Sequence, residues 1–313
     1  MAFSLRKSSD SGSVGLDIDG RFLAGVVTSD GAIRRAASAD LPDGLMRDGE
    51  VTDPAGLSGE IKRFVAAEKL PRTVRLGVSN QQIVMRMIEL PPIEDPKERE
   101  AAVRFQAAEA IAMPLDEATL DYRVIERVSV DGVERDRMVV VAARRSMIDQ
   151  LLEASRGAGL KVEGIDLNAF ALVRALTSPG AGSESLGENA CVYCHLGATT
   201  NLVIAVGSNC VFTRPLTTSW DAGDAEVASS LAEEIRLSID FHLNLPGARM
   251  VEAVVLTGPG AQSEGLVHAL DAAIGRPVSV AEPLRTLPVY AFSPGEDPHR
   301  YTVAAGLALG AAA

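Results

Sequence analysis

The sequence predicts a two-lobed α/β protein with a small α+β subdomain inserted into its first lobe. Three observations support this prediction. A strand–turn–strand unit at residues 14–27 recurs at residues 191–206, and a helix-forming segment follows each copy. Between the two copies, residues 76–144 have a strand–helix–strand–strand order of their own. The length of 313 residues is sufficient for two ordinary domains.

The first lobe opens with short strands and continues with an amphipathic helix. Its predicted strands lie at residues 14–18, 22–27 and 33–41. An Asp19-Gly20 turn joins the first two of them. Residues 54–69 are predicted to be helical because apolar residues recur at four-residue spacing from Leu57 to Val65.

The inserted unit is predicted from its own strand and helix signals. These elements lie at residues 74–78, 83–90, 96–113, 120–128 and 137–143. Asp95 can cap the helix, Pro96 suits its first turn and Glu98 completes a capping box. Pro114 ends the helix because proline cannot continue it. A further helix begins at Ser146 and leads back to the first lobe.

The second lobe repeats the pattern of the first. Its predicted elements are strands at residues 191–196, 202–206, 209–216 and 251–257, and helices at 225–244 and 301–309. The predicted boundaries place residues 14–75 and 145–176 in the first lobe, 76–144 in the insert and 190–313 in the second lobe. Residues 1–13 are predicted to be disordered, and the Gly-, Ser- and Glu-rich residues 177–189 to be a linker.

The composition excludes several classes of function. A formal charge of −12 repels nucleic-acid phosphates. An aromatic content of 4% leaves few side chains on which nucleic-acid bases could stack. No apolar run approaches the roughly 20 residues that a membrane span needs, and the N-terminus lacks a secretory signal. We therefore expect a cytoplasmic protein that neither inserts into a membrane nor binds nucleic acid, with reduced cysteines.

Three glycine-containing turns follow strands and are the candidates for binding chemistry. They lie at residues 17–20, 197–200 and 258–261. Free backbone N–H groups at such turns can hold phosphates, and a carboxylate beside them can position Mg²⁺. One such turn is weak evidence because hairpins need glycine anyway, whereas three in duplicated lobes are more specific.

These turns and several other stretches resemble the type IV pilus assembly protein PilM family, which is related to FtsA in the actin-like ATPase superfamily. The resembling stretches are residues 14–18, 46–51, 53–54, 89–92, 104–109, 113–117, 121–122, 139–144, 158–160, 196–201 and 256–261. The resemblance covers residues 14–310. It implies an actin-like fold of two ribonuclease-H-like lobes around a nucleotide cleft, with an inserted α+β subdomain.

The resemblance also implies which residues would line a nucleotide site. These are Asp17, Gly20, Gly197, Thr199, Thr200, Glu234, Arg236, Gly258 and Gly260. The chain departs from the family pattern at Asp19, Ala24, His195, Leu237 and Pro259. Asp19 adds a carboxylate that repels phosphate, and His195 replaces the carboxylate that positions Mg²⁺. We therefore expect no cofactor or only weakly bound ATP and Mg²⁺, with no catalytic residue and no metal ligand.

The resemblance further implies a scaffold for a pilus or related assembly complex. Such a scaffold would bind the cytoplasmic N-terminal segment of a PilN-like inner-membrane protein and link it to the pilus motor ATPases. It would lie at the cytoplasmic face of the inner membrane. We expect the partner segment to bind in a groove between the first lobe and the insert.

Two other functions remain open at this point. An active ATPase or sugar kinase would need the carboxylate that is missing at His195 and a general base near the γ-phosphate. An FtsA-like filament protein would carry a basic amphipathic C-terminal helix, whereas residues 307–313 are apolar.

Some local patterns suggest other chemistry but have simpler structural explanations. Residues 191–195 match the haem c attachment pattern Cys-x-x-Cys-His, yet the segment is apolar and strand-like, which favours buried cysteines over haem or a redox dithiol. Gly258-x-Gly260 lacks the remaining spacing of a dinucleotide fingerprint. Ile83, Met85 and Met87 are typical of a core face rather than a cofactor site.

Overall fold

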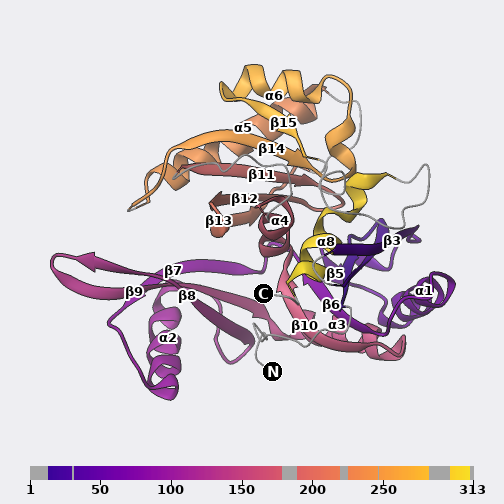
Figure 1. Ribbon diagram of the computed structural model, residues 1–313, viewed down its shortest axis with the longest axis horizontal. Helices are drawn as coiled ribbons and strands as arrows, with labels where there is room; N and C mark the ends of the chain where they lie inside the picture. Colours follow the sequence, from indigo (N-terminus) through magenta and orange to yellow (C-terminus); the bar gives the residue numbers. More distant parts are fainter. Residues whose placement is uncertain are drawn as a thin grey trace. The chain divides into compact units, whose positions relative to one another are not determined.

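The computed structural model describes residues 13–29, 32–177, 189–218, 225–245, 247–281 and 297–310 (Figure 1). The predicted disordered N-terminus and linker lie outside these residues, apart from their ends. The chain forms two compact units. One contains Gln81–Leu151, and the other contains the described residues up to Asn80 and from Leu152 onward.

The first sheet of the larger unit has five strands in the order β10-β6-β1-β2-β3. They are β1 (Ser13–Ile18), β2 (Phe22–Ser29), β3 (Ala32–Asp40), β6 (Thr73–Val78) and β10 (Lys161–Leu167). The predicted domain boundary placed residues 76–78 of β6 in the insert, and this was wrong. The strand pairs in parallel with β1 and β10, so its buried apolar side chains belong to the first lobe.

Helix α1 (Pro54–Ala67) covers one face of this sheet, and its start follows from capping chemistry. The Asp53 side chain accepts a 2.9 Å hydrogen bond from the Gly56 N–H, and Pro54 occupies the first turn. Phe64 of α1 approaches Gly25 of β2, where a side chain would collide with the neighbouring Leu70. The helix therefore packs closely on the sheet.

A short hairpin precedes α1 and was not predicted. Its strands are β4 (Met46–Arg47) and β5 (Glu50–Val51). Asp48 and Gly49 both have positive φ angles, 52° and 77°, as a two-residue hairpin turn requires. Gly49 also lies so close to the Ser79 carbonyl that any side chain there would overlap it.

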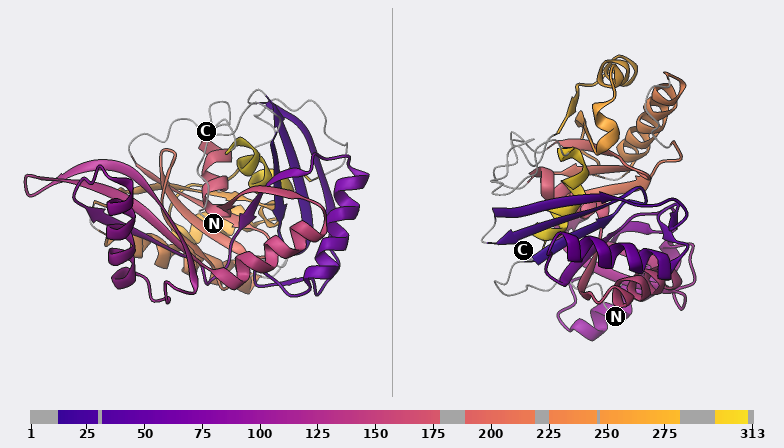
Figure 2. Two further views of the ribbon diagram at one scale, coloured as in Figure 1. Left: turned by 90° about the horizontal axis from the view of Figure 1, so that it is seen from below. Right: turned by 90° about the vertical axis from the view of Figure 1, so that its right-hand side faces the viewer.

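The second sheet of the same unit has the order β13-β12-β11-β14-β15. Its strands are β11 (Ala190–Leu196), β12 (Thr200–Val206), β13 (Asn209–Pro215), β14 (Val251–Thr257) and β15 (Val278–Val280). Helices α5 (Ala225–Leu243) and α6 (Leu266–Ile274) pack together with this sheet around one apolar core (Figure 2). The sequence analysis missed α6 and β15.

The final helix α8 (Thr302–Leu309) corrects the predicted domain assignment. Sequence analysis placed it in the second lobe, but Tyr301 and Ala304 share a core with Phe22 and Ala24 of the first sheet. Gly15 of β1 has no room for a side chain because α8 backbone atoms lie where its Cβ would be. A helix this apolar needs burial on several sides.

Helix α4 (Asn168–Thr177) packs against α8 and also contacts the second sheet. At their crossing, a Cβ added to Gly306 would lie only 1.8 Å from the Ala171 carbonyl oxygen. Arg174 secures the crossing, since its guanidinium donates to the Gly306 carbonyl at 2.6 Å and to Asp166 at 2.8 Å. The two helices thus connect the first sheet to the second.

The smaller unit contains a three-stranded antiparallel sheet and one covering helix. Its strands run in the order β7-β9-β8, with β7 (Val84–Leu90), β8 (Ala118–Val130) and β9 (Val133–Arg144). Helix α2 (Pro96–Ala110) packs on one face, and α3 (Arg145–Gly157) leads back to the larger unit. β7 and β9 pair in antiparallel register, so residues 84–90 and 136–142 lie in one sheet.

Candidate functional site

The three predicted glycine turns belong to the larger unit and come together at the ends of β1, β11 and β14. The first turn, after β1, touches the second turn, after β11: the Ala198 N–H donates a 2.8 Å hydrogen bond to the Asp19 carboxylate. The third turn, after β14, reaches the same place, because Gly258 lies against the Leu196 backbone. The structure therefore assembles one polar site from segments far apart in the sequence.

Asp19 occupies the centre of this site. Its Oδ2 atom accepts from Ala198 and lies 2.3 Å from where a Cβ on Gly197 would be, so only glycine fits there. The Arg21 N–H contributes a longer contact of 3.4 Å. Burial raises the pKa of the Asp19 carboxyl, while the hydrogen bonds from Ala198 and Arg21 oppose that shift. A carboxylate of this chain thus binds the backbone donor of the second turn.

Asp17 lies two residues earlier on β1 and is fully buried. Burial raises the pKa of its carboxyl well above the usual range, the nearby Asp19 raises it further, and a backbone hydrogen bond from Ile18 opposes the shift. Its Oδ1 atom has no hydrogen-bond partner among the described residues. Thr200, at the start of β12, is likewise buried and its hydroxyl has no partner there.

His195 ends β11 at the position where the resembling family has a carboxylate. The side chain is only 4% exposed. Burial, and to a smaller extent the nearby His299, lowers the pKa of His195 to about 4. The imidazole is therefore neutral at physiological pH and supplies no negative charge to the second turn. Among the described residues, no three His, Cys, Asp or Glu side chains cluster as metal ligands would.

The third turn combines a glycine at positive φ with a proline. Gly258 has a φ of 86°, a conformation that favours glycine, and a Cβ there would lie 2.8 Å from the Leu196 carbonyl oxygen. Pro259 follows as the first residue of a short 3₁₀ segment, Pro259–Gln262, and contributes no N–H donor. Gly260 lies within that segment. The turn approaches the second turn closely but offers one backbone donor fewer.

Glu234 and Arg236 were predicted to face a nucleotide, but they lie apart from each other on α5. Successive residues turn by about 100° around a helix, so these two side chains point in nearly opposite directions. Glu234 accepts hydrogen bonds from the backbone and hydroxyl groups of Thr217 and Thr218, at 2.5–3.1 Å. Burial opposes ionisation, but these hydrogen bonds outweigh it and lower the pKa of Glu234. Arg236 is exposed.

A polar contact that sequence analysis missed lies beside the second turn. The side-chain amide of Asn201 donates to the Ser79 hydroxyl at 2.7 Å, which joins β12 of the second sheet to the end of β6 in the first. Asn201 directly follows the predicted Thr199-Thr200 pair, and Thr199 is half-buried in the turn. The run of polar residues Thr199, Thr200 and Asn201 was the only sequence feature that could have pointed to this contact. Their partner, 122 positions away, was not evident from the sequence.

The cysteine pattern has a structural explanation. Cys191, Cys194 and Cys210 are all buried, and none of them forms a disulfide among the described residues. Cys194 faces the core with α5 and α6, whereas Cys191, three residues earlier on the same strand, points to the opposite face. Burial raises the pKa of each thiol to about 12. This geometry confirms the prediction of buried strand cysteines and excludes a disulfide between Cys191 and Cys194 in this fold.

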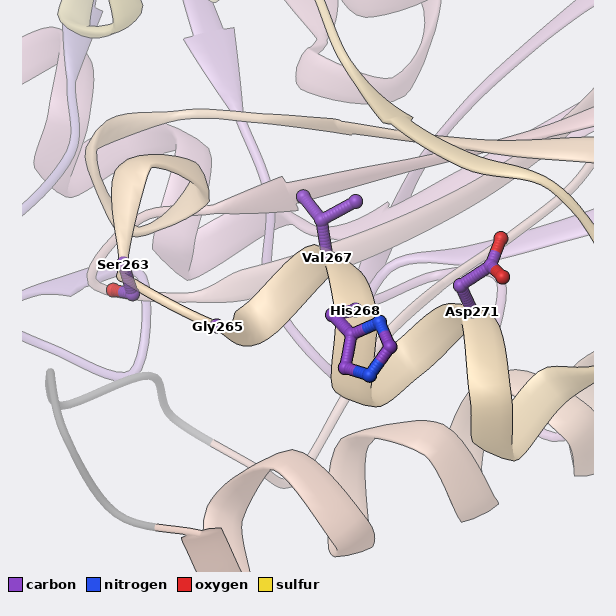
Figure 3. A pocket seen from close by; sticks show the side chains of 5 residues that line it. All are labelled: Ser263, Gly265, Val267, His268 and Asp271. Atoms are coloured by element: carbon purple, nitrogen blue, oxygen red, sulfur yellow. The ribbon is translucent and has the colours of Figure 1, made fainter.

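A separate pocket of about 370 Å³ lies along α6 (Figure 3). Ser263, Gly265, Val267, His268 and Asp271 line it, and none of them is a predicted site residue. The Asp271 carboxylate already accepts a 3.0 Å hydrogen bond from the Val278 N–H. This pocket therefore lacks the converging donors that the three turns provide.

Comparisons with known proteins agree on the fold. The profile of the family described as type IV pilus assembly protein PilM matches residues 27–218. A chain in the solved PilM-PilN type IV pilus biogenesis complex is 28% identical, with a TM-score of 0.83 over 97% of this chain and 99% of that chain.

Two more distant structures resemble the chain in fold alone. One is a Bacteroides thetaiotaomicron protein with an actin-like ATPase fold, at 10% identity and TM-score 0.52, covering 88% of this chain and 93% of its own. The other is the cytoplasmic domain of EpsL, an inner-membrane component of the type II secretion system of Vibrio cholerae, at 13% identity and TM-score 0.51, covering 96% and 95%. The predicted actin-like, two-lobed fold is confirmed.

Proposed function

Because the chain belongs to the type IV pilus assembly PilM family, we propose that it is an actin-like scaffold whose task is to hold a membrane partner rather than to hydrolyse ATP. The partner is a PilN-like inner-membrane protein, bound through its cytoplasmic N-terminal segment. The scaffold would lie at the cytoplasmic face of the inner membrane and connect this partner to the pilus motor ATPases. No helix in the described residues is both long and apolar enough to span a bilayer.

One observation carries the proposed partner. The 28% identical relative was solved as part of a PilM-PilN complex, and the similarity extends over almost the full length of both chains. It therefore includes the inserted unit as well as the two lobes. A shared fold over the whole length supports a shared mode of assembly.

The residues at the three turns do not fit ATP and Mg²⁺, which supports a scaffold. Asp19 already occupies the Ala198 N–H that would otherwise be available to a phosphate oxygen. His195 is neutral where a carboxylate would position the metal ion, and Pro259 removes a donor from the third turn. The Glu234 carboxylate already accepts hydrogen bonds from the hydroxyl groups of Thr217 and Thr218. We propose that nucleotide binding is weak or absent.

The inserted unit supplies features that an extended peptide needs. β7 and β8 are the edge strands of its sheet, so each has one side without a neighbouring strand among the described residues. The edge strand β8 carries exposed charges at Arg123, Glu126 and Arg127, which discourage strand addition. Along β7, Met87 is half-buried beside Val139 on the face opposite α2. We propose that the partner segment runs along β7 and packs on Met87.

Fluorescence anisotropy with the labelled N-terminal segment of the PilN-like protein from the same genome tests this proposal. We expect saturable binding tighter than about 100 μM, roughly −5.5 kcal/mol. A scrambled peptide of the same composition controls for charge attraction. Absence of saturable binding to folded protein would overturn the scaffold function.

Two variants test the location of the site separately. Met87→Glu places a charge beside the proposed peptide path and should weaken binding at least about tenfold. Phe105→Ser on α2 removes a side chain that is 71% exposed and should leave the affinity unchanged. If both variants bind like the wild type, the function stands but the β7 site is wrong.

A further inference from the structure

Helix α5 presents an apolar surface that its own core does not use. Leu237 and Phe241 lie one turn apart on its outer face and are 56% and 55% exposed. Phe212 of the edge strand β13 joins them, with its ring centroid 5.4 Å from that of Phe241. We call Phe212, Leu237 and Phe241 the α5 patch. Phe212 is half-buried and also packs against the core of the second sheet, whereas Leu237 and Phe241 are exposed. Such a cluster is typical of contact surfaces rather than of scattered surface residues.

Two opposite charges flank the α5 patch. Arg236 precedes Leu237, and Asp240 precedes Phe241, so each apolar residue has a charged neighbour on the same outer face. The four-residue spacing would allow Arg236 and Asp240 to pair on the helix. Yet neither side chain has an ion-pair or hydrogen-bond partner in the part of the chain that the structure describes. Both charges are therefore available to another molecule.

This order of side chains is self-complementary. If two α5 helices pack antiparallel about a two-fold axis, Leu237 of each copy meets Phe241 of the other. In the same arrangement Arg236 of each copy comes within reach of Asp240 of the other, because residue offsets of two correspond to about 3 Å along a helix. One rotation thus satisfies two apolar contacts and two ion pairs.

We propose that the α5 patch is an isologous interface at which two copies of this chain associate through antiparallel α5 helices. The occupant is a second copy rather than an unrelated protein because the charges match under exchange of the two chains. The chain carries a net charge of −12, which opposes self-association in general. A local arrangement that neutralises two acidic and two basic groups is therefore required for two copies to meet. A contact centred on three apolar side chains per copy is small, so we expect a weak dimer.

Sedimentation velocity on the full chain, from about 5 to about 200 μM, tests the dimer over the range of weak affinities. We expect the wild type to shift from monomer to dimer. Arg236→Asp and Asp240→Arg each place like charges opposite one another twice, and each should weaken the dimer at least about tenfold. Circular dichroism confirms that these exposed substitutions leave the fold intact.

Mixing the two variants gives the decisive result. In a mixed dimer, the aspartate introduced by Arg236→Asp faces the arginine introduced by Asp240→Arg, and the native Asp240 of the first variant faces the native Arg236 of the second. The mixture should therefore associate with an affinity within about threefold of the wild type, although each variant alone does not. A wild type that stays monomeric throughout, or a mixture that fails to associate while the wild type does, would overturn the proposal.

Discussion

Replacing the buried His195 should reduce the acid sensitivity of this fold. A buried neutral imidazole stabilises the folded state only while it stays neutral, since charging it in a dry site is unfavourable. Its pKa is lowered from 6.5 to about 4, mainly by burial. Because the folded-state value is depressed, this contribution is fully present above pH 6.5 and is lost as the pH falls through about 4.

The size of the effect follows from the two pKa values. The interval between 6.5 and about 4 corresponds to roughly 3 kcal/mol of unfolding free energy. About 2 kcal/mol of this is already lost at pH 5. His195→Asn keeps a polar side chain but does not titrate. The variant should be less stable near neutrality, by about 1–2 kcal/mol, because packing is lost. It should nearly match the wild type at pH 5.

Urea unfolding followed by circular dichroism, at about pH 7.5, 6 and 5, measures this difference. The exposed His268, on α6, provides a matched control for the same substitution at the surface, and His268→Asn should leave the unfolding free energy at about pH 7.5 within about 0.5 kcal/mol of the wild type. The stability gap between the wild type and His195→Asn should shrink by about 2 kcal/mol over this range. A gap that stays constant with pH would refute the assignment of a buried, neutral His195.

Three further predictions concern other contacts. Asp19→Gly frees the Ala198 N–H of the second turn and should strengthen ATP binding at least about tenfold, measured by calorimetry, without ATP turnover. An unchanged affinity for ATP would contradict the inference that Asp19 blocks this donor. Glu234→Gln should weaken the hydrogen bonds to the two threonines by about 1–2 kcal/mol, measured as faster amide exchange at those residues. Gly306→Ala should destabilise the protein by more than about 3 kcal/mol in thermal unfolding, because the added Cβ would overlap the Ala171 carbonyl. The control Gly59→Ala, in open space on α1, should stabilise the protein by about 0.5–1 kcal/mol. Equal effects of the two substitutions would exclude the close α4–α8 crossing.

Local patterns were sufficient to predict several elements, including strands that are buried on both faces. Helix α1 and strands β1, β2, β11 and β12 were found because their apolar residues or turn signals repeat with the period of the element. Helix α4, which is apolar and largely buried, was missed. Strand β15 has only three residues.

Tertiary relations were much harder to infer than the elements themselves. The placement of β6 beside β1 and β10, and of α8 on the first sheet, depends on pairing between distant segments. The same is true of Asp19. Its charge predicted repulsion of phosphate, but the sequence did not reveal that Ala198, 179 residues away, supplies a backbone donor to it. The three glycine turns were found together because repeated lobes place equivalent turns on a common side.

The central claim is that this chain is a scaffold whose partner binding does not depend on ATP. The most direct test is a titration of the labelled PilN-like N-terminal segment with the full chain, by anisotropy, with and without saturating ATP and Mg²⁺. We predict saturable binding with the same dissociation constant in both conditions, within about twofold, because the three turns do not fit the nucleotide. Binding that appears only with ATP and Mg²⁺, or that changes more than about tenfold on their addition, would contradict the claim.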